Sequence, residues 1–168
     1  MKFLKYTLIF AFGILLVNCG DEKKEEAKET EFKIGSESVE VADDNVANIT
    51  ITGDDAMKFN KSELRVKAGQ KVKLTLTHIG TMDVKLMGHN VVILKQGVDA
   101  ATFAAEAALA VDNNYIPEGT TDVIAHTDMI GGKQSTTVEF TAPEAGTYDF
   151  ICSFPAHFAL MQGKFIVE

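Results

Sequence analysis

Three side chains that bind soft metal ions lie close together near the end of the chain. Cys152, His157 and Met161 stand in the run Cys-Ser-Phe-Pro-Ala-His-Phe-Ala-Leu-Met, and His89 lies far upstream in a Met-Gly-His-Asn segment. One thiolate, two imidazoles and one weak thioether are the ligands of blue-copper sites, where the thioether is a long axial contact. A fold that uses this set must bring two distant segments together and hold them rigidly.

Each of these residues also has an ordinary structural explanation. A buried cysteine often packs as a small apolar side chain, and a single histidine or methionine is more often part of a core than a ligand. The combination favours a metal site, because soft thiolate and thioether donors select copper or zinc. Structural zinc sites use two or more thiolates with histidine, so one cysteine with two histidines and a methionine favours copper.

The spacing around Cys152 is compatible with such a site. Apolar and polar residues alternate along 147–152, so Cys152 is expected on the core face of a strand. Pro155 cannot donate to a sheet and favours a turn. The segment 163–167 then returns as the next strand, and the loop between the strands can fold the other two ligands back toward the thiol.

Alternation of apolar and polar residues predicts a mostly β domain, with 71–77 as the clearest half-buried strand. An alanine-rich segment at 99–111 indicates a helical insertion outside the sheets. We expect about eight strands in an all-β sandwich, at 47–52, 63–67, 71–77, 91–95, 122–125, 136–141, 148–152 and 163–167.

The N-terminus has the pattern of an export signal. Lys2 and Lys5 precede a mostly apolar stretch at 8–17, which is short for a membrane span. The stretch ends in Leu-Val-Asn-Cys, which resembles a bacterial lipobox, so residues 1–18 are interpreted as a lipoprotein signal peptide and Cys19 as the lipidated residue. The alternative is an ordinary signal peptide followed by a coincidental cysteine.

Residues 19–44 form the next expected unit, a lipidated cysteine followed by a charged tether. This segment is rich in Asp, Glu and Lys and cannot bury enough apolar surface to fold. Residues 45–168 have the size of one domain. Loss of residues 1–18 lowers the 16 basic residues to 14 against 24 acidic ones, a net charge of −10, which argues against nucleic-acid binding.

In four segments the chain resembles the azurins, members of the cupredoxin superfamily, and the resemblance covers 45–168. The matching segments are 87–90, 123–127, 130–131 and 152–161. The resemblance implies a Greek-key β-sandwich of the cupredoxin type and one type 1 copper ion that alternates between Cu(II) and Cu(I).

The resemblance also implies a role for individual residues. The equatorial copper ligands are expected to be His89, Cys152 and His157, with Met161 as the long axial ligand and the carbonyl of Gly88 as a distant axial contact. Asn90 is expected to join the His89 segment to the Cys152 loop by hydrogen bonds, and Phe154 to lie beside the ligands.

Three features depart from the azurin pattern. The chain has only two cysteines, so the usual disulfide near the start of the domain is absent, and it has no tryptophan. Val91 stands where azurins often have a buried aromatic residue. Ala156 and Phe158 replace small or polar neighbours of the loop histidine, which reshapes the surface at the metal edge.

The function expected from the resemblance is that of an electron carrier in the periplasm or at a membrane surface. Electrons are expected to pass through the exposed edge of His157 to a c-type cytochrome or a terminal reductase. Redox encounters are small and weak, so a modest apolar patch is sufficient for docking. The expected patch consists of Met57, Met87, Phe154, Pro155, Phe158 and Leu160. The lipid on Cys19 would hold the protein to a bacterial membrane, facing the periplasm or the cell surface.

Two other functions use the same residues. An enzyme is not expected, because only four histidines exist and the remaining two, His78 and His126, are too few for a second copper site. A copper scavenging or delivery lipoprotein remains an alternative with the same ligands. His78 ends a strand near the expected site, either as a structural residue or as a group linked to the copper by pH, and His126 is expected at the surface.

Overall fold

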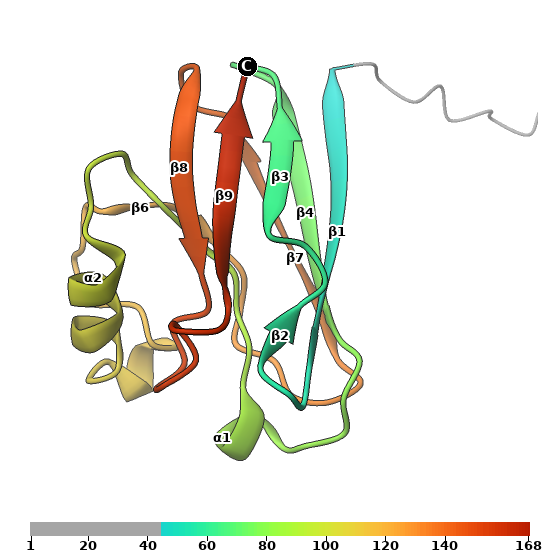
Figure 1. Ribbon diagram of the computed structural model, residues 1–168, viewed down its shortest axis with the longest axis vertical. Helices are drawn as coiled ribbons and strands as arrows, with labels where there is room; N and C mark the ends of the chain where they lie inside the picture. The colour runs from blue at the N-terminus through green and yellow to red at the C-terminus, as the bar shows by residue number, and fades with distance from the viewer. Residues whose placement is uncertain (1–44) are drawn as a thin grey trace, which may run out of the picture. The chain divides into compact units, whose positions relative to one another are not determined.

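The computed structural model describes residues 45–168, and they form two β-sheets (Figure 1). The first sheet has the order β2-β1-β4-β7 and contains β1 (Val46–Asp54), β2 (Lys58–Phe59), β4 (Lys71–His78) and β7 (Ser135–Thr141). The second has the order β3-β9-β8-β5-β6 and contains β3 (Glu63–Val66), β5 (Val92–Leu94), β6 (Val123–His126), β8 (Gly146–Ile151) and β9 (Gln162–Val167). Three short helices complete the described part: α1 (Val84–Met87), α2 (Ala100–Ala107) and the 3₁₀ turn η1 (Val111–Asn113).

The all-β sandwich with a helical insertion is thus confirmed, with nine strands among the described residues rather than about eight. The additional strand, β2, has two residues and is too short to show an alternating pattern. The strand β1 pairs in parallel with β4, as β3 does with β9, and the remaining pairs are antiparallel. The expected signal peptide, the tether and Cys19 lie outside the described residues.

Strand β4 shows how the sequence pattern places a residue at the site. Val72, Leu74 and Leu76 are buried, while the residues between them are exposed or half-buried. Because side chains alternate along a strand, the same register turns His78, the last residue of β4, into the interior. An imidazole therefore ends the row of aliphatic core residues.

Strand β5 is buried on both faces, which explains its continuous apolar sequence. Val91 and Ile93 pack into the core between the sheets, whereas Val92 and Leu94 pack under α2 against Phe103. Helix α2 therefore covers the outer face of the second sheet, as its position beside that sheet in Figure 1 shows. A half-buried strand would need polar residues at alternate positions.

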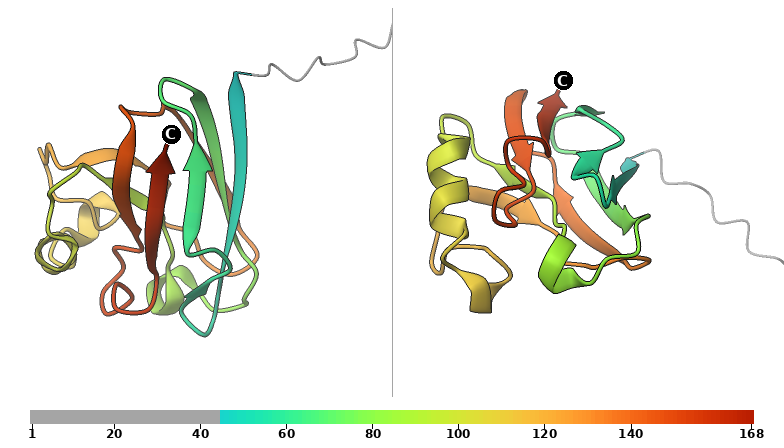
Figure 2. Two further views of the ribbon diagram at one scale, coloured as in Figure 1. Left: turned by 45° about the horizontal axis from the view of Figure 1, so that its top comes forward. Right: turned by 60° about the horizontal axis from the view of Figure 1, so that its bottom comes forward.

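Several connections meet at the end of the sandwich opposite the C-terminus. There the β1–β2 turn, α1 and the loop between β8 and β9 lie near one another in all three views (Figures 1 and 2). The segments that carry the expected ligands are among them. Within 45–168, no helix has both the length and the apolar character that a membrane span requires.

Candidate metal centre

The loop after β8 is closed by backbone hydrogen bonds. The amide of Cys152 donates to the carbonyl of Met161 at 2.9 Å, so the two ends of the loop pair with each other. Inside the loop, His157 donates to the carbonyl of Phe154 at 3.1 Å, and Met161 donates to the carbonyl of His157 at 2.8 Å. The loop is therefore a fixed turn that directs the His157 ring toward the Cys152 thiol.

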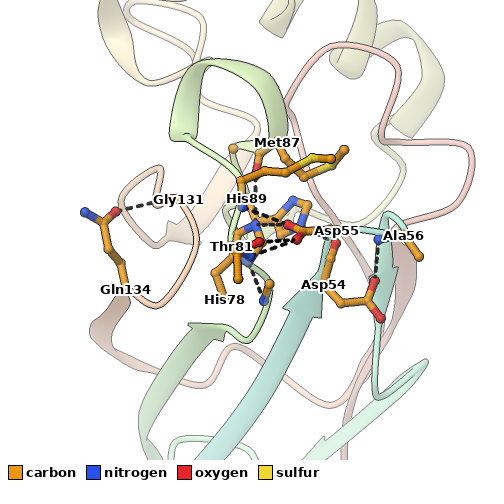
Figure 3. A network of polar contacts seen from close by, with 12 residues as sticks. Asp54, Asp55, Ala56, His78, Thr81, Met87, His89, Gly131 and Gln134 are labelled. Carbon is orange, nitrogen blue, oxygen red and sulfur yellow. Dashed lines mark hydrogen bonds and ion pairs between the residues drawn. The ribbon is translucent and has the colours of Figure 1, made fainter.

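The segment around His89 is held in place by equally short contacts. His89 and Ile130 exchange both backbone hydrogen bonds at 2.9 Å. The His89 ring stacks on His78 with centroids 4.3 Å apart and planes 13° apart, and its Nε2 lies 2.9 Å from the carbonyl oxygen of Asp54 (Figure 3). A carbonyl can only accept, so Nε2 carries the proton and donates, and Nδ1 presents a lone pair.

The two segments bring one thiol and two imidazoles together. The candidate ligand atoms of His89, Cys152 and His157 all lie within 4.8 Å of one another. The Cys152 Sγ lies 3.6 Å from the Nδ1 of His157. All three side chains are buried, and only His157, at 3% exposure, reaches the surface at all. The edge of His157 that was expected to be exposed is therefore narrow.

The two expected axial groups are also at this place. Met161 is fully buried and packs in one cluster with Cys152 and Phe154. The carbonyl oxygen of Gly88 lies 3.8 Å from the Cys152 Sγ. The structure thus brings all five expected ligands to one site, and their coordination of a metal remains a prediction.

The protonation states of the three groups suit a cation. Burial raises the pKa of the Cys152 thiol to about 11. The pKa of His157 is lowered to about 4, mainly by burial and to a smaller extent by the neighbouring His89 and His78. Burial also lowers the pKa of His89. Both imidazoles are therefore neutral near pH 7 and offer lone pairs, and a metal ion that binds the sulfur displaces the thiol proton.

One orphaned atom tests whether copper fits this site. The Nδ1 of His89 is buried and has no hydrogen-bond partner among residues 45–168. Leaving a buried polar atom unsatisfied is costly, and native structures rarely do so without a reason. This lone pair faces a soft sulfur and a second imidazole, which is the donor set that copper prefers. The residues present therefore fit a copper ion.

Asn90 links the two ligand segments directly. Its Oδ1 accepts from the amide of Ser153 at 2.9 Å, and its Nδ2 donates to the Ser153 Oγ at 2.8 Å. A longer bond of 3.4 Å runs from Nδ2 to the carbonyl of Asn114. Ser153 follows Cys152 in the chain, so these bonds set the distance between the His89 and Cys152 segments. Groups that orient ligands in this way tune a bound metal.

Phe154 is buried beside the site. Its ring lies 4.6 Å from the centroid of His157 and 5.2 Å from that of Tyr115, in an edge-on arrangement with the latter. These contacts restrict the rotation of the His157 ring and exclude water from it.

The expected docking residues differ in exposure. Leu160 is 60% exposed, whereas Met57, Met87 and Pro155 are half-buried. Phe158 is also half-buried and packs against the apolar cluster under α2. Five further large apolar residues of the described part are exposed and were not among the expected docking residues, namely Ile79, Met82, Leu86, Leu109 and Val111. Met82 and Leu86 could have been noticed, since each stands beside a charged residue, Asp83 or Lys85, just before the Met-Gly-His-Asn motif.

Comparisons with known proteins agree with this geometry. A family model described as copper binding proteins of the plastocyanin/azurin family matches residues 45–168. Azurin-1 of Alcaligenes xylosoxydans xylosoxydans is 38% identical over 120 residues, which cover 69% of this chain and 93% of that protein. The azurin of Pseudomonas fluorescens biotype B is 41% identical over 119 residues, which cover 68% of this chain and 92% of that protein. The solved structure of auracyanin A, a "blue" copper protein of Chloroflexus aurantiacus, has a TM-score of 0.67 at 35% identity and covers 73% of this chain and 99% of its own.

Proposed function

This chain belongs to the plastocyanin/azurin family of copper-binding proteins, and from that premise we propose that it is a mobile carrier of single electrons. The observation that carries the proposal is the convergence of His89, Cys152 and His157 on one buried point, with an imidazole nitrogen that has no hydrogen-bond partner in the described part of the chain. A copper ion held by these groups would accept and release one electron as it alternates between its cupric and cuprous states.

The chain contributes rigidity and the exclusion of water. The His89 ring is fixed by a stacked imidazole and a backbone carbonyl, and Cys152 is fixed by the pairing of its amide with Met161. Ligands held in this way cannot rearrange freely when the charge at the centre changes. The buried position of the site lowers the local dielectric and disfavours the more highly charged state.

Electrons have a short route to the surface through His157, since it alone of the three groups reaches solvent. The exposed apolar residues at this end of the sandwich include Met82, Leu86 and Leu160, with exposures of 45%, 71% and 60%. We call these three residues the apolar rim. A small number of exposed apolar side chains suits brief, weak docking of a redox partner such as a c-type cytochrome or a terminal reductase.

Electron self-exchange between two copies of the copper-loaded protein tests the proposal without an identified partner. Leu86→Glu and Leu160→Glu are each expected to slow this exchange at least about tenfold, because docking must then desolvate a carboxylate. The visible spectrum should not change, since neither side chain belongs to the ligand set. The rate is measured from NMR line widths in mixtures of oxidised and reduced protein.

Thr141→Glu is the matched control. It adds the same charge at an exposed position opposite Lys71, at the end of β4 farthest from His78, about 20 Å away along the strand. This variant is expected to exchange electrons at the rate of the unaltered protein. Equal slowing by all three variants would show that net charge matters and the rim does not, and slow exchange in the unaltered protein would contradict the carrier function.

The alternative of copper scavenging or delivery has less support. Handing a metal ion to another protein requires ligands that the recipient can reach, and the three groups here are buried within a sandwich. The same burial is suitable for a metal ion that stays in place while electrons pass. Rapid loss of copper to an acceptor protein, without electron exchange, would favour delivery.

The location of the protein is the remaining part of the proposal. The lipobox-like sequence before Cys19 supports export and a lipid anchor, with the protein facing the periplasm or the cell surface. In a bacterial host, Cys19→Ala is expected to move the protein from the membrane fraction to the soluble fraction and to abolish lipid on the mature N-terminus by mass spectrometry. An unmodified Cys19 in the mature protein would contradict the anchor.

A further inference from the structure

The carbonyl that orients His89 belongs to a turn that leaves the end of β1. Asp54 ends β1, and its carbonyl oxygen accepts from the Nε2 of His89 at 2.9 Å. The Asp54 carboxylate holds the turn from inside, accepting from the amides of Ala56 at 3.0 Å and Lys58 at 3.1 Å. The direction of this carbonyl therefore depends on how the turn is fixed against the rest of the molecule.

The next residue, Asp55, fixes the turn against the loop that follows β4. Its Oδ2 accepts from the amide of Thr81 at 2.8 Å and from the Thr81 hydroxyl at 3.3 Å, and its Oδ1 accepts from the amide of Met82 at 3.2 Å (Figure 3). The amide of Thr81 is the first cause of the lowered pKa of Asp55. A carboxylate with several N–H donors forms stronger bonds than a neutral group does.

The approach of the two segments requires a glycine. A side chain at Gly80 would place its first carbon 2.1 Å from the Oδ1 of Asp55, so only a residue without a Cβ lets the carboxylate reach the loop. The amide of Ile79 also donates to the carbonyl of Gly53 at 2.8 Å. The turn and the loop are thus in contact at the backbone as well as through Asp55.

The same loop holds the second group that contacts His89. The amide of Gly80 donates to the Nδ1 of His78 at 3.0 Å, and the Nε2 of His78 donates to the carbonyl of Met87 at 2.9 Å. His78 is the ring on which His89 stacks. Asp55 therefore joins the two elements that orient His89, the Asp54 carbonyl and the His78 ring.

We propose that Asp55 is a positioning residue for the metal centre, which fixes the direction of the His89 imidazole by clamping the 54–57 turn to the 79–82 loop. The inference rests on the proposed function, because it takes His89 as a copper ligand. Asp55 does not touch the ligand atoms, and it acts through the Asp54 carbonyl and the loop that contacts His78.

Asp55→Ala and Asp55→Asn test the proposal in the metal-free protein by NMR. Loss of the carboxylate is expected to raise the exchange rate of the His89 Nε2 proton with solvent at least tenfold, since its acceptor is no longer held in line. Asp55→Asn keeps one acceptor oxygen and should give a smaller increase. In the copper-loaded protein, Asp55→Ala should also shift the visible band and the reduction potential.

Asp99→Ala is the matched control. Asp99 caps α2 by accepting from the amide and hydroxyl of Thr102 at 2.8 and 2.6 Å, the same pair of donors that Thr81 gives to Asp55. Asp99→Ala should lower the melting temperature about as much as Asp55→Ala does. It should leave the exchange rate of the His89 Nε2 proton and the copper spectrum unchanged.

The outcomes separate the two proposals. An unchanged His89 proton in Asp55→Ala, or an equal change in Asp99→Ala, overturns the positioning role even if the unaltered protein is blue and exchanges electrons. Faster proton exchange in Asp55→Ala alone supports the role. Failure of the unaltered protein to bind copper overturns the proposed function, and it also removes the reason to call His89 a ligand.

Discussion

Cys152→Ser is expected to remove the blue colour completely and to weaken copper binding by at least about 100-fold, more than the loss of an outer group costs. The colour of such sites comes from a thiolate bound to the cupric ion, and a serine hydroxyl cannot replace it. Serine fits the buried space of Cys152 and can donate to the Gly88 carbonyl, which now lies 3.8 Å from the sulfur. The visible spectrum and the copper content of the purified variant give the result.

Ser153→Ala is the control for this variant. It removes the hydroxyl that accepts from Asn90 at 2.8 Å but keeps the thiol and the amide of residue 153. The protein should stay blue, with at most a shifted band. Retention of the intense colour in Cys152→Ser would show that the sulfur is not a ligand.

Gly88→Ala is expected to lower the free energy of unfolding of the metal-free protein by about 3 kcal/mol, the upper part of the range for overpacking a dense interior. A Cβ at this position would lie 2.6 Å from the backbone oxygen of Val84, 2.8 Å from the sulfur of Met129 and 2.8 Å from the Phe154 ring. The backbone oxygen cannot move without unwinding α1, so the collision is not easily relieved. Denaturant unfolding of both proteins measures the difference.

Gly97→Ala separates this collision from the effect of glycine on the backbone. Gly97 has a φ of +81° and nothing within 4 Å of an added Cβ. Gly97→Ala should therefore lower the free energy of unfolding by only about 1 kcal/mol, because alanine disfavours the left-handed conformation. Gly88 has a φ of −67°, which any residue can adopt, so the loss of stability expected for Gly88→Ala comes entirely from steric overlap. An equal or smaller loss for Gly88→Ala would contradict the packing described at this site.

Eight of the nine described strands could be predicted because each is long enough to show which of its residues are buried, whereas β2, with two residues, is not. The alternation along β4 predicted a half-buried strand, and the structure shows the buried and exposed positions in that order. Helix α2 is shorter than the alanine-rich segment suggested, ending at Ala107. The chain then turns through η1 and the left-handed Asn114, whose carbonyl contacts Asn90. Helix propensity is a weak guide to where a helix ends, because the surrounding tertiary structure can override it.

The candidate ligands could be identified from the sequence because their chemistry is distinctive. Thiol, imidazole and thioether groups that occur together in this spacing are typical of a site for a soft metal ion. The structure brings these groups together. The groups that orient His89 could not be identified in this way. One of them is the backbone carbonyl of Asp54, and every residue type has a backbone carbonyl. The His89 ring also needs the space beside Gly53, because a Cβ at that position would lie 2.7 Å from the ring.

The surface was the least predictable part. Phe158, an expected docking residue, is half-buried with part of its side chain packed under α2, whereas Leu86, which was not among the expected docking residues, is 71% exposed. Aromatic and aliphatic residues in loops are equally compatible with a core or a rim. Only the path of the loop in three dimensions decides between them.

X-ray absorption at the copper edge of the reconstituted protein tests the central claim most directly. The structure predicts one copper ion per chain, bound to the sulfur of Cys152 and to one nitrogen each of His89 and His157, with any other contact longer. The spectrum should therefore show a single short sulfur shell and two imidazoles. A copper ion surrounded only by nitrogen and oxygen, or by two short sulfurs, would contradict the account.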